Sequence, residues 1–297
     1  MRRPEGTDTQ SMGAAAVEVA LLGVAATAIP DVPCTPHELP ADPSREDLGR
    51  IVELLRTGDR EVVVIVPNVI AAHGRQRLQT AASALGGRPI AFHMTALSGL
   101  GVATLGALAA GATPHVASAG VLAGALPALE RELTAAAVLR GVARLTSPRP
   151  GFGQRLRGLL PGTLFAARGG DGPVVASADR RAPGAALAAL LPADSATVLA
   201  ARGRGTRHGE QTARVIADAT GAAPLQAPEQ AAGLPGGWGR EPLLEAVAWP
   251  AEQAAMLQRV FGRPFVPCPW CDRPAAVTPC PTCGHDRNPA LSGALGA

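Results

Sequence analysis

Four cysteines near the end of the chain have the spacing of a metal site. They form two C-x2-C pairs with eight residues between the pairs: Cys268, Cys271, Cys280 and Cys283. Each pair can direct two thiolates at one point, and two pairs complete a tetrahedral shell of sulfur ligands. Because such a shell leaves no open coordination position, the pattern predicts one structural zinc ion in a short zinc ribbon. A redox-active C-x-x-C opens a helix in a thioredoxin-like unit, and that context is missing from this sequence.

Ser98 and the glycines after it do not match a known catalytic loop. Ser98 lies in the sequence L-S-G-L-G, which lacks the G-x-S-x-G pattern of a nucleophile elbow. We expect this serine to cap the N-terminus of a buried helix. Thr104 occupies the position of the third glycine in G-x-G-x-x-G, so the glycines indicate close helix packing and not a phosphate-binding loop.

Three histidines, three arginines and one cysteine are further candidates for binding or chemistry. Three histidines have no spacing that requires a metal, and we expect them in the core or at an interface: His73, His93 and His115. Three arginines within one segment either bind a phosphate, as in a pantetheine or nucleotide, or form a solvated loop: Arg202, Arg204 and Arg207. Cys34 is a lone thiol in a proline-rich segment.

The composition fits a globular protein with a core of small aliphatic residues. The chain has 297 residues, of which 47% are apolar and only 3% aromatic. All 27 basic residues are arginines, so lysine chemistry such as a Schiff base or a Walker A lysine is excluded. The net charge is +3 and the arginines are scattered among acidic residues, which argues against a nucleic-acid-binding stripe.

Neither the most apolar stretch of the chain nor its N-terminal segment suggests a membrane or secreted protein. The most apolar stretch, residues 94–126, is broken by Gly, Ser, Thr, Pro and His, which favours buried elements over a membrane span. Residues 1–13 have two arginines but lack the apolar region of a signal peptide. We therefore predict a cytoplasmic protein.

The apolar patterns predict alternating strands and helices on both sides of a central loop. Strands are expected at residues 17–24, 61–66, 88–94, 115–119, 163–167, 173–178 and 197–201. Helices are expected at residues 45–56, 69–85, 99–110, 122–145, 184–191, 210–219 and 243–260, the last interrupted at Pro250. This alternation predicts an α/β protein with parallel sheets.

We expect five parts along the chain. They are a leader (1–13), an N-terminal half (14–147), a connecting loop (148–162), a shorter C-terminal half (163–262), and the zinc ribbon with its tail (263–297).

Two segments resemble the active-site regions of the thiolase and β-ketoacyl synthase superfamily. Residues 61–120 are similar to the stretch around the family's nucleophile, where an A-C-S-G motif opens a buried helix. Here the motif is Ala96-Leu97-Ser98-Gly99, so Leu97 holds the position of the nucleophilic cysteine. Residues 197–221 are similar to the synthase segment H-G-T-G-T-x-x-G-D, with Arg202 at the position of the histidine. The resemblance covers residues 15–250.

The resemblance implies a layered α/β/α/β/α body without condensing activity. Leucine cannot carry an acyl group, and a guanidinium has no lone pair available for base chemistry at neutral pH. In this superfamily such losses occur in partner subunits, as in the chain-length factors of type II polyketide synthases. The resemblance therefore implies a homodimer, or a heterodimer with an active ketosynthase-like subunit, that shapes products in polyketide or fatty-acid-type biosynthesis. Acyl carrier protein would be a further partner, and the strand at 115–119 would pair across the dimer axis.

A second class of function stays open at this point. The chain could be an unrelated α/β scaffold or binding protein whose zinc ribbon docks a protein or, with less support, a nucleic acid. An active enzyme has the least support, because no pair of nucleophile and base stands out in the sequence.

Overall fold

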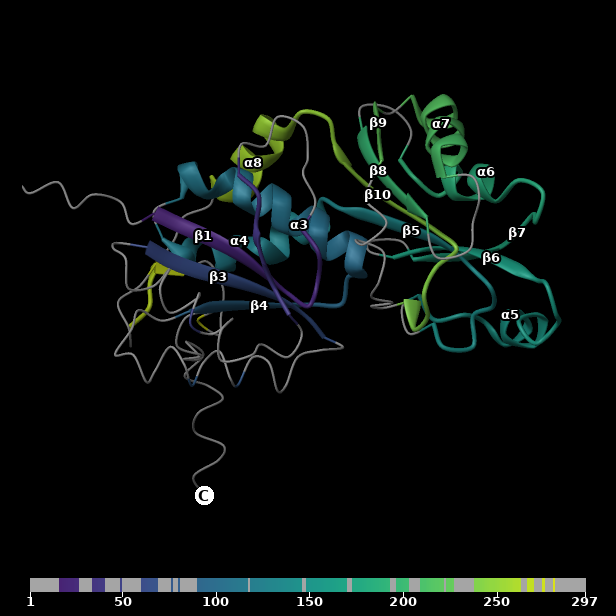
Figure 1. Cartoon of the computed structure of the whole chain (residues 1–297), viewed down its shortest axis with the longest axis horizontal. Coiled ribbons are helices and arrows are strands. Elements are labelled where there is room, and N and C mark those ends of the chain that lie inside the picture. The colour runs from purple at the N-terminus through teal and green to yellow at the C-terminus, as the bar shows by residue number, and fades with distance from the viewer. Residues whose placement is uncertain are drawn as a thin grey trace, which may run out of the picture.

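The structure is a computed structural model, and it describes the chain with gaps. The described residues are 16–26, 34–40, 49, 60–68, 76, 80, 90–116, 118–145, 148–169, 173–192, 196–202, 209–221, 223–226, 238–262, 266–269, 274–275 and 280. Figure 1 shows two sheets toward opposite ends of the long axis, one formed by the early strands and one by the later strands. We refer to these sheets with their helices as the first and the second half.

The sheet of the first half is parallel. Its strands lie in the order β2-β1-β3-β4 and have these bounds: β1 Ala16–Leu22, β2 His37–Leu39, β3 Arg60–Pro67 and β4 Ala91–Thr95. β3 is almost wholly apolar and β-branched, as expected for a parallel strand that is buried on both faces. Side chains on one face of this sheet, including Val19 and Val63, join the main core, whereas Val62 and Val64 belong to a separate cluster on the other face.

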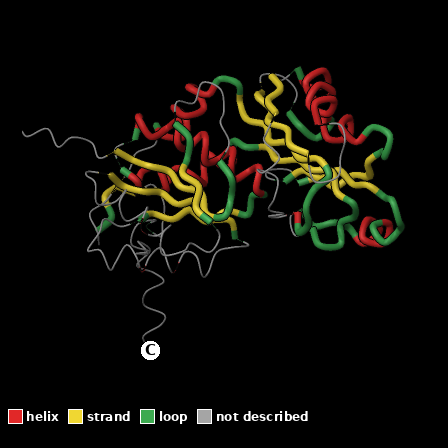
Figure 2. The backbone as a smooth tube through the Cα atoms, in the orientation of Figure 1, coloured by secondary structure: helices red, strands yellow, loops and turns green. Residues whose placement is uncertain are grey.

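Two helices pack on the inner face of the first sheet, on one side of its strands in Figure 2. They are α3 (Gly99–Ala112) and α4 (Ala119–Arg131), joined by a short 3-10 helix, η1 (Thr113–His115). Every residue of α3 is buried, and its small side chains allow close approach to the sheet. A Cβ atom at Gly106 would lie 2.4 Å from a methyl carbon of Leu21, so only glycine fits there without a shift. α4 is fixed at its N-terminus by Glu61, whose carboxylate accepts the Ala119 N–H at 2.6 Å.

The sheet of the second half is mixed. Its order is β7-β6-β5-β10-β8-β9, and all neighbours are antiparallel except β8 and β9. The strands have these bounds: β5 Thr134–Leu139, β6 Leu164–Arg168, β7 Val174–Ala178, β8 Ala196–Arg202, β9 Ala223–Gln226 and β10 Leu244–Pro250. Its helices are α5 (Phe152–Arg157), α6 (Pro183–Ala188) and α7 (Gly209–Thr220).

Alternating residues of β10 face two different cores. Leu244, Ala246 and Ala248 belong to a cluster that also contains residues of α6 and α7. Val247 and Trp249 join the main core, which includes α3 and α4. This period-2 alternation is that of a strand with both faces covered, and it ties the second sheet to the helices of the first half.

The chain then returns to the first half. α8 (Gln253–Phe261) contacts α4, and so does β12 (Pro274–Ala275), which pairs with β11 (Val266–Pro267). In the part of the chain that the structure describes, no helix is long and apolar enough to cross a membrane.

Much of the expected secondary structure is confirmed. The described strands β1, β3, β4, β6, β7 and β8 and the helices α3, α6 and α7 coincide with predicted elements to within a few residues. The helices expected at 45–56 and 69–85 lie almost entirely outside the described residues. The predicted loop at 148–162 contains α5, and the change from the first sheet to the second comes earlier, between α4 and β5.

Three predicted elements are wrong. Residues 115–119 form the end of η1 and the start of α4 instead of an interface strand, because Ser118 caps a helix there. The helix expected at 122–145 ends at Arg131, and the β-branched and alanine run that follows becomes β5. The helix expected at 243–260 is instead β10 followed by α8, because its first part is placed between β5 and β8.

The fold class is therefore α/β, with one parallel and one mixed sheet. The expectation of parallel sheets in both halves is wrong for the second half, where antiparallel pairs dominate.

Candidate functional site

The second half contains a cavity of about 1070 Å³ on the face of its sheet that carries α6 and α7. The cavity is lined by the turn at 158–163, the segment 180–185 that leads into α6, Val215 of α7, and Leu243 and Leu244 at the start of β10. A ligand of drug or lipid size fits in a space of this order. The cavity is therefore the candidate ligand site of this protein.

The cavity lining combines apolar side chains with a nearly equal share of polar surface. Most of its residues are leucine, proline, alanine, valine or glycine, and Leu159 and Leu160 are 73% and 61% exposed. Phe152 and Leu156 of α5 are exposed as well, so large apolar side chains gather on α5 and the turn after it. Exposed apolar side chains grouped in this way indicate a surface that meets an apolar ligand or partner.

The charged residues that the structure describes in the cavity lining are all basic. Arg140, Arg180 and Arg181 belong to the lining, and no acidic residue among the described ones does. Guanidinium groups bind carboxylates and phosphates through paired, charge-assisted hydrogen bonds. Apolar walls with three arginines can hold an amphipathic anion, with its apolar part on the leucines and its acidic group at the arginines.

Gly162 places one of these arginines. Its φ is +81°, which favours glycine. A Cβ atom at this position would lie 2.5 Å from Nη1 of Arg180 and 3.1 Å from its Cζ. The guanidinium of Arg180 therefore packs directly on the backbone of the turn, and a larger residue at position 162 would displace it.

A second polar group lies on the opposite face of β10. Glu245 is fully buried, and its Oε1 accepts hydrogen bonds from the Ser98 hydroxyl and from the Trp238 indole N–H, the latter at 2.9 Å. Among the residues that the structure describes, none forms a hydrogen bond with its Oε2. Burial raises the pKa of Glu245 to about 7, and the hydrogen bonds from Ser98 and Trp238 oppose this shift.

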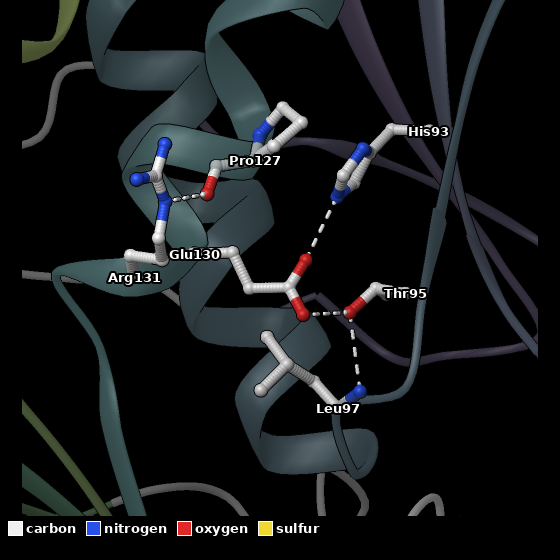
Figure 3. Close-up of polar contacts among 6 residues, drawn as sticks. All are labelled: His93, Thr95, Leu97, Pro127, Glu130 and Arg131. Carbon is white, nitrogen blue, oxygen red and sulfur yellow. Dashed lines mark hydrogen bonds and ion pairs between the residues drawn. The ribbon is translucent and has the colours of Figure 1, made fainter. Parts of the chain in front are cut away.

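A third polar group fixes the end of α4 to β4, as Figure 3 shows. The Glu130 carboxylate lies 3.0 Å from His93 Nε2 and accepts the Thr95 hydroxyl at 2.9 Å. Thr95 Oγ1 in turn accepts the Leu97 N–H at 3.1 Å. These contacts join a helix to a strand, and we assign them a structural role.

The structure places the predicted site residues separately. Ser98 caps α3 as expected, since its hydroxyl accepts the Gly101 N–H, and half-buried Leu97 precedes this cap. Arg202 is the last residue of β8, whereas Arg204 and Arg207 lie outside the described residues. Leu97 therefore precedes α3 in the first half, whereas Arg202 ends β8 in the second half.

The histidines and Cys34 fall into different surroundings. His93 is buried, as expected for a core histidine, but His115 is exposed at the end of η1. His73 lies outside the described residues. Cys34 is exposed.

The prediction of zinc as a cofactor is not supported. Cys268 and Cys280 are buried and cluster together, but among the described residues no group of three or more His, Cys, Asp or Glu could hold a metal ion. Cys271 and Cys283 lie outside the described residues, so the grouping of all four cysteines stays a sequence prediction. We do not retain zinc in the account of function.

Sequence reasoning missed both Glu245 and the cavity arginines. A signal for Glu245 was present, because a single acid in the apolar run LLEAVAW must be either on a solvated face or buried with partners. The pair Arg180-Arg181 directly before a helix beginning at Pro183 gave a weaker signal.

Comparison with known proteins places the fold. No family model and no curated protein matches the sequence. A DegV family protein from Corynebacterium glutamicum has a similar structure, with a TM-score of 0.54 and 15% identity, covering 80% of this chain and 98% of that one. A fatty-acid-binding DegV family protein from Thermus thermophilus has a TM-score of 0.52 and 14% identity, covering 79% and 99%. The Fatty Acid Kinase (Fak) B3 protein from Streptococcus pneumoniae, loaded with linoleic acid, has a TM-score of 0.52 and 12% identity, covering 80% and 99%.

These similarities correct the resemblance to thiolases and ketosynthases. The short motif around Leu97 and the glycines after Arg202 matched locally, but the two sheets have the arrangement of a different fold. The five-layered body and the role of a chain-length-factor-like subunit, with a ketosynthase partner in polyketide biosynthesis, are accordingly wrong. The chain has the fold of the DegV family proteins.

Proposed function

We propose that this protein binds a single-chain amphipathic acid of the fatty-acid class in the cavity of its second half. The observation that carries the proposal is the lining of the cavity, in which apolar side chains lie beside three arginines and, in the part of the chain that the structure describes, no acid. The fatty-acid ligands of the T. thermophilus and S. pneumoniae proteins, which have a similar fold, support it.

The two parts of the cavity would contribute differently to affinity. Each methylene group removed from water contributes about 0.8 kcal/mol. A hydrogen bond to a charged group contributes about 1.5–3 kcal/mol. For a ligand with on the order of ten buried methylenes the acyl chain therefore supplies most of the binding free energy, and the arginines select an acidic head group and set its orientation.

The proposal includes a protein partner that supplies or uses the ligand. The S. pneumoniae protein, which has a similar fold, is named as a component of a fatty acid kinase, and this name supports the partner. The cytoplasmic location remains a prediction from the sequence within this proposal.

Equilibrium binding to the delipidated protein tests the proposal. We expect saturable binding of palmitate with one ligand per chain, weaker binding of the uncharged alcohol of the same chain length, and affinity that rises with chain length. The double variant R180A/R181A should reduce palmitate affinity by at least about 10- to 150-fold, the loss expected for a single charge-assisted hydrogen bond of about 1.5–3 kcal/mol. R259A, which removes a 55% exposed arginine of α8 outside the cavity lining, is the matched control and should bind like the parent. An absence of saturable binding for every straight-chain acid would contradict the proposal.

A further inference from the structure

The buried carboxyl group of Glu245 joins two parts of the molecule that are distant in sequence. Glu245 is on β10 of the second half, and Ser98 precedes α3 of the first half, 147 residues away. Trp238, which donates the other hydrogen bond, is itself buried. This contact therefore lies at the seam between the two halves, in the interior.

Only one oxygen of the carboxyl group is satisfied in this arrangement. Both donors bind Oε1, while Oε2 is buried and has no hydrogen-bond partner in the described part of the chain. The residues opposite Glu245 on the neighbouring strands are Ala137 of β5 and Ala201 of β8. The first turn of α3 contains no acidic residue, and among the described residues the only polar groups that face the carboxyl group are the Ser98 hydroxyl and the Trp238 indole.

In this geometry the neutral carboxylic acid is more stable than the carboxylate. A buried carboxylate with one bare oxygen is costly, because the charge is desolvated and only half of its acceptor sites are filled. A neutral carboxylic acid avoids most of the desolvation cost and still accepts both hydrogen bonds on Oε1. An ionised Glu245 therefore gains free energy by reaching water, which requires the start of α3 to separate from β10.

We propose that Glu245 and Ser98 form a proton-controlled latch between the two halves, closed while Glu245 is protonated and loosened when it ionises. In the closed state the side chain ionises only around pH 7, whereas in water-exposed form it ionises near its ordinary pKa of 4.5. Between these values the open form releases a proton that the closed form keeps, so rising pH favours opening. Each unit of difference between these two pKa values changes the ratio of open to closed forms tenfold. This ratio therefore rises by up to about 300-fold between pH 4.5 and about pH 7 and is constant at higher pH.

Amide hydrogen exchange on the ligand-free chain tests the latch. Protection of the first turn of α3 and of β10 is compared from about pH 5 to about pH 8, after correction for the intrinsic pH dependence of exchange. We expect protection to fall with pH in the parent protein and to be independent of pH in E245Q, which mimics the neutral acid. E252Q, which changes an exposed glutamate before α8, should behave like the parent.

A second variant keeps the test informative if E245Q does not fold. S98A removes a hydrogen bond that stabilises the carboxylate, so the pKa of Glu245 in the closed form rises further. The pH at which the loss of protection is complete should therefore move above pH 7. A purely structural role of Ser98 as helix cap would lower protection equally at every pH. Equal pH dependence in the parent and E245Q, or a uniform loss in S98A, would overturn the proposal.

Discussion

Replacing Gly162 with alanine should weaken ligand binding through its effect on Arg180. The added Cβ would lie 2.5 Å from Nη1 of that arginine, which is too close for any real contact, and the flexible side chain must move away. If the guanidinium then no longer reaches the acidic head group, one charge-assisted hydrogen bond worth about 1.5–3 kcal/mol is lost. This corresponds to a loss of palmitate affinity of about 10- to 150-fold. Alanine at this positive φ, which glycine adopts without strain, also destabilises the folded protein by about 1–2 kcal/mol.

A double-mutant cycle separates these two effects. Palmitate affinity is measured by calorimetry for the parent, G162A, R180A and G162A/R180A, and unfolding by urea is measured for the same four proteins. If Gly162 acts on binding by positioning Arg180, the double variant should bind no more weakly than R180A alone, since the guanidinium has already been removed. The loss of stability, by contrast, should persist in the double variant because backbone strain does not depend on the arginine. Additive losses of affinity would refute this account of the turn, as would unchanged affinity in G162A.

Three further predictions concern stability. Phe165→Ala should lower the free energy of unfolding by about 3–5 kcal/mol, because this fully buried ring lies in the core shared by both halves, and a urea midpoint close to that of the parent would contradict this packing. Gly106→Ala should destabilise by about 1–3 kcal/mol in spite of the better helix propensity of alanine, because the new methyl group overlaps fully buried Leu21; a raised melting temperature would show that the leucine can move aside. Between pH 4.5 and about pH 7 the unfolded state ionises Glu245 while the folded state keeps its proton, so the free energy of unfolding should fall by about 3 kcal/mol as pH rises, with the full loss present above pH 7. E245Q should remove this component of the pH dependence in chemical denaturation, and an unchanged slope would assign it to other groups.

Local sequence patterns were sufficient for several elements. The run EVVVIV predicted β3 because a short, continuous segment of β-branched residues favours a buried strand over a helix. Ser98 followed by small residues predicted the capped and fully buried α3. In both cases the periodicity and the capping chemistry act within one element, so no partner needs to be known.

Local patterns failed wherever contacts with neighbouring elements of the fold determined the conformation of a segment. The segment LLEAVAWP has an apolar pattern compatible with a helix, and it became β10 because β5 and β8 offer it backbone hydrogen bonds on both sides. The short motif Ala96-Leu97-Ser98-Gly99 suggested a thiolase-like site because a four-residue match contains no information about the order of strands.

The composition and the local patterns of this chain determined an α/β protein with a small-residue core, and the tertiary structure decided where its chemistry lies. The cavity arginines come from the end of β5 and from the segment before α6, and they line one space only because antiparallel pairing brings these segments to the same end of the second sheet. The raised pKa of Glu245 likewise depends on its burial in the folded core, and the Ser98 hydroxyl that opposes this shift comes from 147 residues away. The sequence gives the type of each side chain. Its desolvation and its neighbours depend on long-range packing, which local sequence patterns do not reveal.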